Sequence, residues 1–496
     1  MEIDKNNTSH NFIKLNYIIN LLTVIAPKLI YQISPALILL VFSNINMANA
    51  IISTTSSKTI QGNPPEFFIT DSVNNKLGFK YNHQNYSESI GNVQSDSILY
   101  FNKPMINLND FKMITFFTKR RTTNDLTGDY FDVDGDDFAD IPVTQDLTFI
   151  WRDNNNKEID VNDYENIGCH NNKYAMPLTL EIISNNIQVH TKYGHPNTSD
   201  PVQPIIKTYQ LAFVGICYAK PNSLIVDPTT QWRAVKADKT GLSGWNPTGV
   251  NINGASQTES VLFYGGGYAK NYVPYHGFKF KPGNNTLSHF PYTGFDGAQF
   301  QVVMSGSQED YNYSISYNSG KYTVDQNGMI TFVDKSEPED EIIMTATLKS
   351  DPNYTFKYNF KIAKWLYPMK IFDDESFNFT IEEMKQLCIN DNKVLATYRD
   401  LSGSTKYFEY NVMTRSIGGV ITEWGRLAQP GQKTSDTYPK SKWGYAWYYN
   451  RDFIKNKETG GKVQPIIVSS YDGMVSLPSL WNGFSNKSFV CQAVRE

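Results

Sequence analysis

Between residues 51 and 365 the sequence has no run with the spacing of an amphipathic helix. Short segments rich in β-branched and aromatic residues, such as Leu147–Trp151, Leu178–Ile183 and Ile205–Phe213, alternate with clusters of Asn, Asp, Gly and Pro. This pattern is typical of antiparallel strands joined by turns. A parallel α/β fold would need helices of about 10–15 residues between its strands. The sequence therefore predicts a mainly β fold.

Residues 296–363 are predicted to form a small sandwich. Five segments with strand character follow one another: Gln299–Met304, Tyr313–Tyr317, Met329–Val333, Ile342–Leu348 and Tyr354–Ile362. Asn327-Gly328 lies between two of them, and this dipeptide favours a two-residue hairpin turn because both residues tolerate positive φ. About 70 residues with five or more strands suit an immunoglobulin-like sandwich.

From Trp365 onward the pattern predicts an α+β domain with its helices first. Thr380 and Glu383 have the spacing of a capping box, and Phe379 and Met384 that of a hydrophobic staple. A second helix is expected to start at Thr397. Only strands and loops are expected after it.

Composition narrows the class of protein. The chain has 496 residues, 19 % charged and 14 % aromatic, with a formal net charge of −4. Few charges and many aromatic residues exclude disorder as the global description. Nucleic acid is not an expected partner, because the sequence has no long basic runs and neutralisation of phosphates needs a basic face. At about 100–200 residues per domain, we expect about two to four domains.

Residues 1–50 are predicted to be a signal peptide. The apolar run Ala36–Phe42 follows three lysines and precedes Ala48-Asn49-Ala50, a small-residue cleavage pattern. The run is shorter than the 18 or so apolar residues of a membrane span. The alternative is an uncleaved anchor that includes Ile18–Ile25, but Lys28 and Gln32 interrupt that stretch. We therefore expect an exported chain without a transmembrane segment in its mature part.

Several motifs in the C-terminal third resemble the C-type-lectin-like domain of intimin and invasin adhesins from Gram-negative bacteria. They are the capped helix ending at Cys388, Thr397–Leu401, Ile421–Gly425, Trp447–Tyr449 and the segment from Asp472 to Cys491. Residues 296–363 resemble the bacterial immunoglobulin-like domains that precede such a tip. Residues from about 65 to 290 resemble the front of the invasin E adhesion region, on Tyr130–Asp140 and Gly215–Tyr218 among other pieces.

This resemblance implies tandem immunoglobulin-like β-sandwich domains followed by an α+β C-type-lectin-like domain. The expected division is a signal peptide at 1–50, an N-terminal β-rich adhesion region at 51–290, an immunoglobulin-like domain at 291–364 and the lectin-like domain at 365–496. The implied function is that of a secreted or cell-surface bacterial adhesin. Its partner would be a protein or glycan receptor on a host cell, bound through the C-terminal domain without catalysis.

Catalytic motifs are missing from the sequence. There is no G-x-S-x-G nucleophile elbow and no H-E-x-x-H zinc helix, and the seven histidines are scattered. Gly265-Gly266-Gly267 lacks the following helix and Lys of a phosphate-binding loop. The alternative function is a carbohydrate-binding protein or carbohydrate-active enzyme that uses the aromatic-rich N-terminal β-domain. A pair of carboxylates at glycosidase separation would favour the enzyme.

An acidic loop is a candidate calcium site. Asp132, Asp134, Asp136 and Asp140 alternate around Gly135. Ca²⁺ takes six to eight oxygen ligands, and alternate carboxylates on a tight turn supply several of them. The loop resembles the calcium loops of FG-GAP-type repeats. The alternative is an acidic surface turn without an ion.

Receptor contact is expected within residues 438–452, because Trp, Tyr and Arg dominate the hot spots of protein interfaces. The candidate contact residues are Trp443, Tyr445, Tyr448, Arg451 and Asp452. Core packing is the alternative, because an alternating strand buries about half of its side chains. The calcium- and sugar-binding triplets of true C-type lectins are absent, and Trp481-Asn482-Gly483 matches them only in part.

Four cysteines permit three disulfide connectivities. We predict Cys169–Cys217 and Cys388–Cys491, because this pairing keeps each bridge within one expected domain. Export favours oxidation of both pairs.

Overall fold

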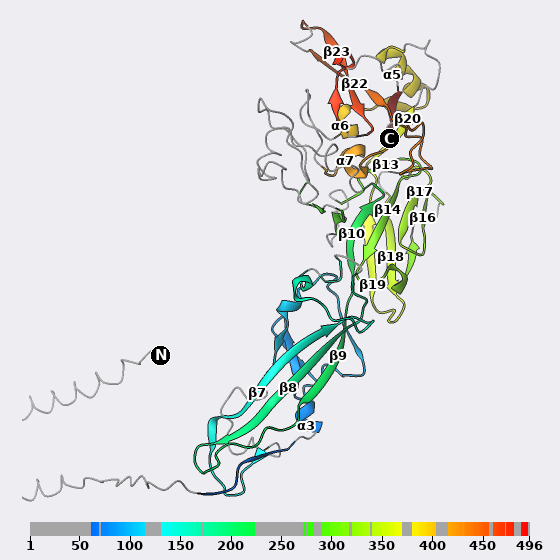
Figure 1. Ribbon diagram of the computed structural model, residues 1–496. Coiled ribbons are helices and arrows are strands. Elements are labelled where there is room, and N and C mark those ends of the chain that lie inside the picture. Colours follow the sequence, from blue (N-terminus) through cyan, green and yellow to red (C-terminus); the bar gives the residue numbers. More distant parts are fainter. Residues whose placement is uncertain are drawn as a thin grey trace, which may run out of the picture. The chain divides into compact units, whose positions relative to one another are not determined.

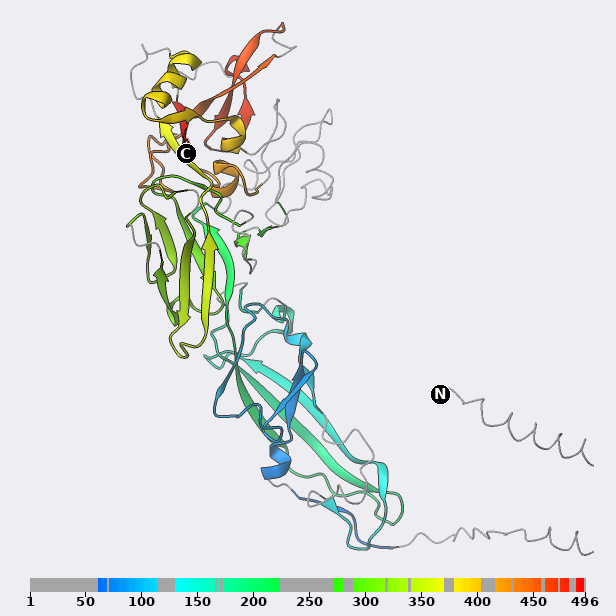
Figure 2. The ribbon, with the colours of Figure 1, turned by 180° about the vertical axis from the view of Figure 1, so that it is seen from behind.

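Figures 1 and 2 show the computed structural model from opposite sides. All elements below belong to the unit Gly62–Glu496. The predicted signal peptide, Gly265–Gly267 and Trp481–Gly483 lie outside the described residues. The structure describes residues 61–68, 71–114, 130–165, 167–169, 173–223, 269, 271–273, 275–280, 289–316, 320–337, 340–369, 379–402, 415–429, 431–455, 460–471, 473–480 and 488–494.

The front region, residues 62–213, is built on one four-stranded sheet. Its order is β4 (Ile98–Phe101), β9 (Ile205–Phe213), β8 (Leu178–Thr191) and β7 (Phe138–Arg152). β4 pairs with β9 in parallel, and the other pairs are antiparallel. Alternate residues of β8 are buried and pack with Phe79 and Trp151 in one core. This core follows from the period of two in the strand sequence.

Smaller elements complete the front region. They are β1 (Glu66–Phe67), α3 (Asp71–Asn74), β2 (Gly78–Tyr81), β3 (Gln84–Ser87), η1 (Leu108–Asp110), β5 (Lys112–Met113), β6 (Tyr130–Phe131) and η3 (Val161–Asp163). β1 pairs with β6, and β2 lies between β3 and β5.

Residues 216–360 contain a sandwich of two sheets that share a core. The larger sheet has the order β11 (Tyr272–Val273), β12 (Gly277–Lys279), β10 (Ile216–Pro221), β14 (Gln299–Met304), β17 (Met329–Phe332) and β16 (Tyr322–Val324). The smaller sheet has the order β15 (Tyr311–Ile315), β18 (Ile342–Leu348) and β19 (Thr355–Phe360), and η5 (Gln308–Asp310) precedes it. Phe300 and Val302 of β14 are buried in the same core as Met344 and Ala346 of β18.

The prediction of successive strands from 299 to 362 is confirmed. β14 and β18 have the expected bounds, and the other three expected segments coincide with β15, β17 and β19 within two residues at each end. The turn between β16 and β17 also forms as expected. Gly328 has φ +71°, and the Asp325 carboxylate accepts hydrogen bonds from the amides of Asn327 and Met329, each at 2.9 Å.

The larger sheet crosses the boundary expected at residue 291. β10 pairs with β14 from Ile216↔Met304 to Pro221↔Phe300, so a strand from before the boundary lies at the centre of the sheet. Only Val214 and Gly215 separate β9 of the front region from β10 of the sandwich. One of the two strands that pair with β14 is therefore distant from it in the sequence.

The C-terminal domain, residues 364–494, combines a sheet with helices, and the first two helices lie at its front as predicted. The prediction that only strands and loops follow them is wrong, because a short helix also forms at Val420–Trp424 and a 3-10 helix at Pro478–Leu480. The sheet order is β13 (Thr293–Gly294), β20 (Lys364–Met369), β25 (Ser488–Ala493), β22 (Trp447–Lys455), β23 (Val463–Ser469) and β24 (Val475–Ser476), and β21 (Lys393–Leu395) also pairs with β25. The helices are α5 (Ile381–Asn390), α6 (Tyr398–Ser402), α7 (Val420–Trp424) and η6 (Pro478–Leu480). The capping box of α5 is confirmed: the amide of Glu383 donates to Thr380 Oγ1 at 3.2 Å, and the amide of Thr380 donates to Glu383 Oε2 at 2.7 Å.

One hydrophobic core joins the sandwich to the C-terminal domain. Trp424 of α7 is fully buried, with its ring 5.0 Å from Phe290 and 5.5 Å from Phe332. Its Nε1 donates to the carbonyl oxygen of Thr293 at 3.1 Å. A cut at residue 365 would therefore divide a single core. The fold-class prediction, mainly β with a final α+β domain, is confirmed.

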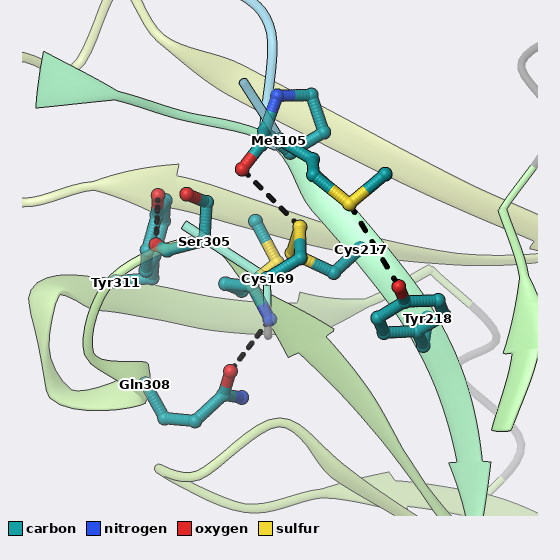
Figure 3. Close-up of a disulfide and its surroundings, with 9 residues drawn as sticks. Met105, Cys169, Cys217, Tyr218, Ser305, Gln308 and Tyr311 are labelled. Carbon is teal, nitrogen blue, oxygen red and sulfur yellow. Dashed lines mark hydrogen bonds between the residues drawn. A yellow bond between two sulfur atoms is a disulfide. The ribbon is translucent and has the colours of Figure 1, made fainter. Parts of the chain in front are cut away.

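Both predicted disulfides are present, and they include all four cysteines. Cys388–Cys491 joins α5 to β25 inside the C-terminal domain. Cys169–Cys217 instead links a loop of the front region to β10 of the sandwich (Figure 3), so the reason given for this pair was wrong.

The surroundings of Cys169–Cys217 are tightly packed. Tyr218 donates from its hydroxyl to the sulfur of Met105 at 4.0 Å. A Cβ at Gly215, where φ is +143°, would lie 3.1 Å from the ring of Pro104. Glycine at this position lets the chain pass directly from one sheet to the next.

Candidate contact surface

Two of the expected contact residues are core residues. Trp443 and Tyr448 are fully buried, and their ring centroids lie 4.9 Å apart. The Trp443 ring also packs on Phe295 at 5.9 Å. The prediction that these side chains contact a receptor is wrong, because the segment before β22 folds back onto Phe295, which supplies an aromatic partner. Burial of such rings stabilises the fold.

Of the remaining candidates, only Arg451 is exposed. Tyr445 is half-buried and meets Tyr471 edge-on, with ring centroids 6.2 Å apart. Asp452 accepts a hydrogen bond from the backbone amide of Tyr398 at 2.8 Å. That amide is the first of α6 and has no acceptor within the helix. Asp452 therefore caps a helix.

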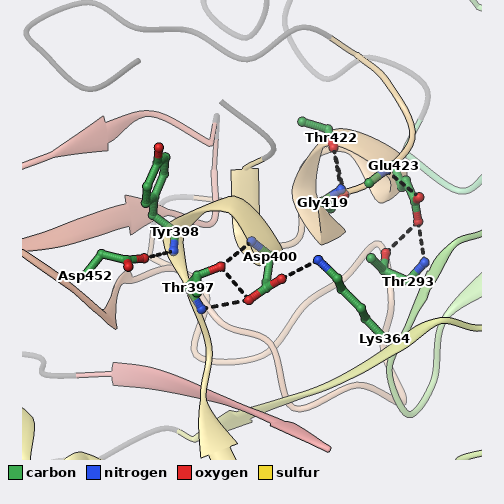
Figure 4. Close-up of polar contacts among 10 residues, drawn as sticks. Thr293, Lys364, Thr397, Tyr398, Asp400, Gly419, Thr422, Glu423 and Asp452 are labelled. Atoms are coloured by element: carbon green, nitrogen blue, oxygen red, sulfur yellow. Dashed lines mark hydrogen bonds and ion pairs between the residues drawn. The ribbon is translucent and has the colours of Figure 1, made fainter. Parts of the chain in front are cut away.

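The start of α6 forms as the sequence predicts (Figure 4). Thr397 donates its amide to Asp400 Oδ2 at 2.8 Å, and the amide of Asp400 donates to Thr397 Oγ1 at 3.1 Å. Lys364 donates to the other oxygen of the same carboxylate. Burial alone would raise the pKa of Asp400, but the hydrogen bonds from Lys364 and Thr397 outweigh it and hold this pKa below its usual value.

A second buried carboxylate ties α7 to β13, the edge strand of the C-terminal sheet. Glu423 accepts hydrogen bonds from the amide of Thr293 at 2.8 Å, from Thr293 Oγ1 at 2.6 Å and from the amide of Gly418 at 2.8 Å (Figure 4). Burial raises the pKa of the Glu423 carboxyl to about 7, although these donors oppose the rise. The motif Ile421–Gly425 thus holds α7 against β13.

The largest exposed apolar side chains of β22 and β23 lie just beyond the predicted segment. Phe453 is 48 % exposed and Val463 is 64 % exposed. Both Figure 1 and Figure 2 show the outer end of this hairpin extending beyond α5 and α6. Sequence reasoning missed these residues because it stopped at Asp452. The alternation in Arg451-Asp452-Phe453-Ile454-Lys455 was the signal that could have found them.

The carboxylates of the acidic loop do not converge. Asp134 accepts from the side-chain amide of Asn63 at 3.1 Å, and Asp132 accepts from the amide of Asp136 at 3.0 Å. A Cβ at Gly194 would lie 2.5 Å from Asp136 Oδ2, so that carboxylate packs against Gly194. Among the described residues, no group of three or more His, Cys, Asp or Glu side chains could hold a metal ion. Calcium binding stays a prediction.

The described part of the chain contains no helix long and apolar enough to cross a membrane. This finding covers the elements from β1 to β25 and does not include residues 1–60.

Residues 272–360 match the family model of invasin domain 4, which corresponds to β11 through β19. Invasin from Yersinia enterocolitica is 26 % identical over 191 residues, which are 37 % of this chain and 20 % of invasin. The aligned part is therefore about a fifth of that relative.

Two solved structures show weak overall similarity. The structure of invasin, titled a bacterial integrin-binding protein, has a TM-score of 0.31 and 14 % identity, and the match covers 73 % of this chain and 74 % of invasin. A 282-residue fragment of intimin, in complex with the intimin-binding domain of the translocated intimin receptor, has a TM-score of 0.26 and 10 % identity, covering 71 % and 99 %. Over part of its length this chain is therefore similar in sequence to invasin, and residues 272–360 match the model of its domain 4.

Proposed function

We propose that this protein is a surface-exposed adhesin that binds a host-cell protein through its C-terminal domain, without catalysis. The match of residues 272–360 to invasin domain 4 carries the proposal. The matched sandwich shares its core with the C-terminal domain through Trp424. It therefore supports that domain as a rigid platform, and loops on a rigid scaffold commonly carry binding sites.

Export is part of the proposal. All four cysteines form disulfides, and such bonds persist in oxidising compartments outside the cytosol. The signal peptide at residues 1–50 would direct the chain there. N-terminal sequencing of the exported protein tests this step, and cleavage after Ala50 is the expected result.

The experiment for adhesion measures binding of the purified full chain to cultured mammalian cells. Saturable binding that disappears after the cells are treated with trypsin supports a protein receptor. Binding that survives trypsin but disappears after glycosidase treatment supports the carbohydrate-binding alternative instead. Lack of saturable binding contradicts the proposed adhesion.

Point variants suit this experiment better than truncations. A chain cut at residue 365 would separate Phe290 and Phe332 from Trp424, and both fragments would expose apolar surface. Apolar surface of that kind binds cells non-specifically.

A further inference from the structure

The outer part of the β22–β23 hairpin has one face turned to solvent. Beyond the bulge after Tyr449, the paired residues are Phe453↔Pro465, Ile454↔Gln464 and Lys455↔Val463. Residues directly opposite each other in antiparallel strands lie on the same face. Phe453, Lys455 and Val463 therefore share a face.

The opposite face is turned toward the protein. Ile454 is partly buried against the main core, and Asp452 caps α6 through the amide of Tyr398. Burial accordingly alternates along Arg451–Lys455, with residues 451, 453 and 455 exposed. We name the exposed set of Arg451, Phe453, Lys455 and Val463 the hairpin face.

The hairpin face combines apolar area with positive charge. Phe453 and Val463 expose about half or more of their surface, and Arg451 and Lys455 lie on either side of Phe453 along β22. In the described residues of β22 and β23 the one acidic side chain is Asp452, which points to the other face. None of the ion pairs among the described residues involves Arg451 or Lys455.

The described neighbours leave this part of the hairpin open at both edges. β22 pairs with β25 through Tyr448 and Tyr449, and β23 pairs with β24 through Ile467 and Val468. Residues 453–455 and 463–465 pair only with each other. A partner can therefore approach the face without displacing a described strand.

We propose that the hairpin face binds an acidic segment of a host-surface protein. Carboxylates of the partner would pair with Arg451 and Lys455, and an apolar side chain between them would cover Phe453 and Val463. This assignment rests on the proposed adhesin function and specifies its contact residues. Charge pairing of this kind raises the association rate and makes binding weaker at high salt. An aromatic anchor next to an arginine matches the composition of interface hot spots.

The test compares two variants of the full chain with two matched controls. Phe453→Ser removes the apolar anchor, and Lys455→Glu reverses one charge. Ile389→Ser on α5 is the apolar control, because Ile389 is 55 % exposed. Lys440→Glu is the charge control, because Lys440 is exposed in the same domain. All four proteins should melt within a few degrees of the wild type, because each changed side chain is exposed.

Two probes are used with each protein. The first is cultured mammalian cells, and the second is a fluorescein-labelled peptide of alternating glutamate and leucine. We expect both hairpin variants to bind cells and peptide at least about tenfold more weakly than the wild type. Both controls should bind like the wild type, and wild-type binding should weaken as salt is raised.

Other outcomes overturn the assignment in distinguishable ways. If the wild type and both hairpin variants bind cells equally well, the hairpin face is not the contact site, and the proposed function is unaffected. Absence of wild-type cell binding rejects the proposed function and this assignment with it. Binding to vesicles of phosphatidylcholine and phosphatidylserine, lost in the variants and without peptide binding, replaces the protein partner by a membrane. If Phe453→Ser melts well below the wild type, the binding of Lys455→Glu alone tests the assignment.

Discussion

Replacement of Trp424 should destabilise the sandwich and the C-terminal domain together. Trp424 is fully buried, and its ring centroid lies 5.0 to 6.1 Å from those of Phe290, Phe295, Phe332 and Phe300. Removal of a buried Trp side chain costs about 3–5 kcal/mol of unfolding free energy. We expect Trp424→Ala to fall in this range. Trp424→Phe keeps a ring but removes the donor to Thr293, and should cost about 1–2 kcal/mol.

Hydrogen exchange followed by mass spectrometry shows which strands are affected. In Trp424→Ala, β14 of the sandwich and β23 of the C-terminal domain should lose protection by a similar amount, because they border one core. Trp151→Ala is the matched control, since Trp151 is also buried but packs in the front region. Its effect should be confined to β7, β8 and β9. Unchanged protection of β14 in Trp424→Ala would refute the shared core.

Three further predictions concern stability. Burial raises the pKa of Glu423 from 4.5 to about 7, so the stability that the protonated carboxyl contributes is complete below pH 4.5 and is lost as the pH rises through 7. The loss in unfolding free energy is on the order of 3 kcal/mol. Chemical denaturation across this pH range should show the loss in the wild type but not in Glu423→Gln. Replacing both Cys388 and Cys491 with serine should lower stability by about 4–5 kcal/mol in the chain-entropy model, since the bridge closes a separation of 103 residues, and calorimetry measures this. If the acidic loop binds Ca²⁺, a hundredfold excess over Kd stabilises the fold by about 2.7 kcal/mol. The melting temperature should then rise with Ca²⁺ and fall with chelator. If Asp134→Ala shows the same difference between the two conditions as the wild type, this loop is not the calcium site.

Local patterns in the sequence were sufficient to predict many of the strands and helices. The strand Ile342–Leu348 alternates between apolar and polar residues, and this period of two places one side of β18 in the core. The Thr380–Glu383 pair predicts the start of α5 because both groups satisfy backbone amides one turn away. These features depend on residues that are close in sequence, so they could be read without a structure.

The pairing of distant strands could not be read in this way. β10 joins the sheet of β14 although about 80 residues separate them in the chain, and nothing in the period of either strand specifies its partner. The expected boundary at residue 291 therefore falls inside a sheet. For the same reason Cys169–Cys217 was paired correctly but was assigned to the inside of one domain.

Two aromatic residues of one segment show why composition alone could not distinguish a buried ring from an exposed one. Trp443 lies in an irregular stretch, and its burial depends on Phe295, which belongs to a distant part of the chain. Phe453 lies in a strand between Arg451 and Lys455. Both cations are spaced two residues from it and are exposed like it, and the strand pairing places Lys455 on its face. Charged side chains are costly to bury without partners, so that face stays hydrated and keeps Phe453 exposed with it. In a strand, charged residues two positions before and after an aromatic residue therefore predict that its side chain is exposed. The aromatic residue alone does not predict this.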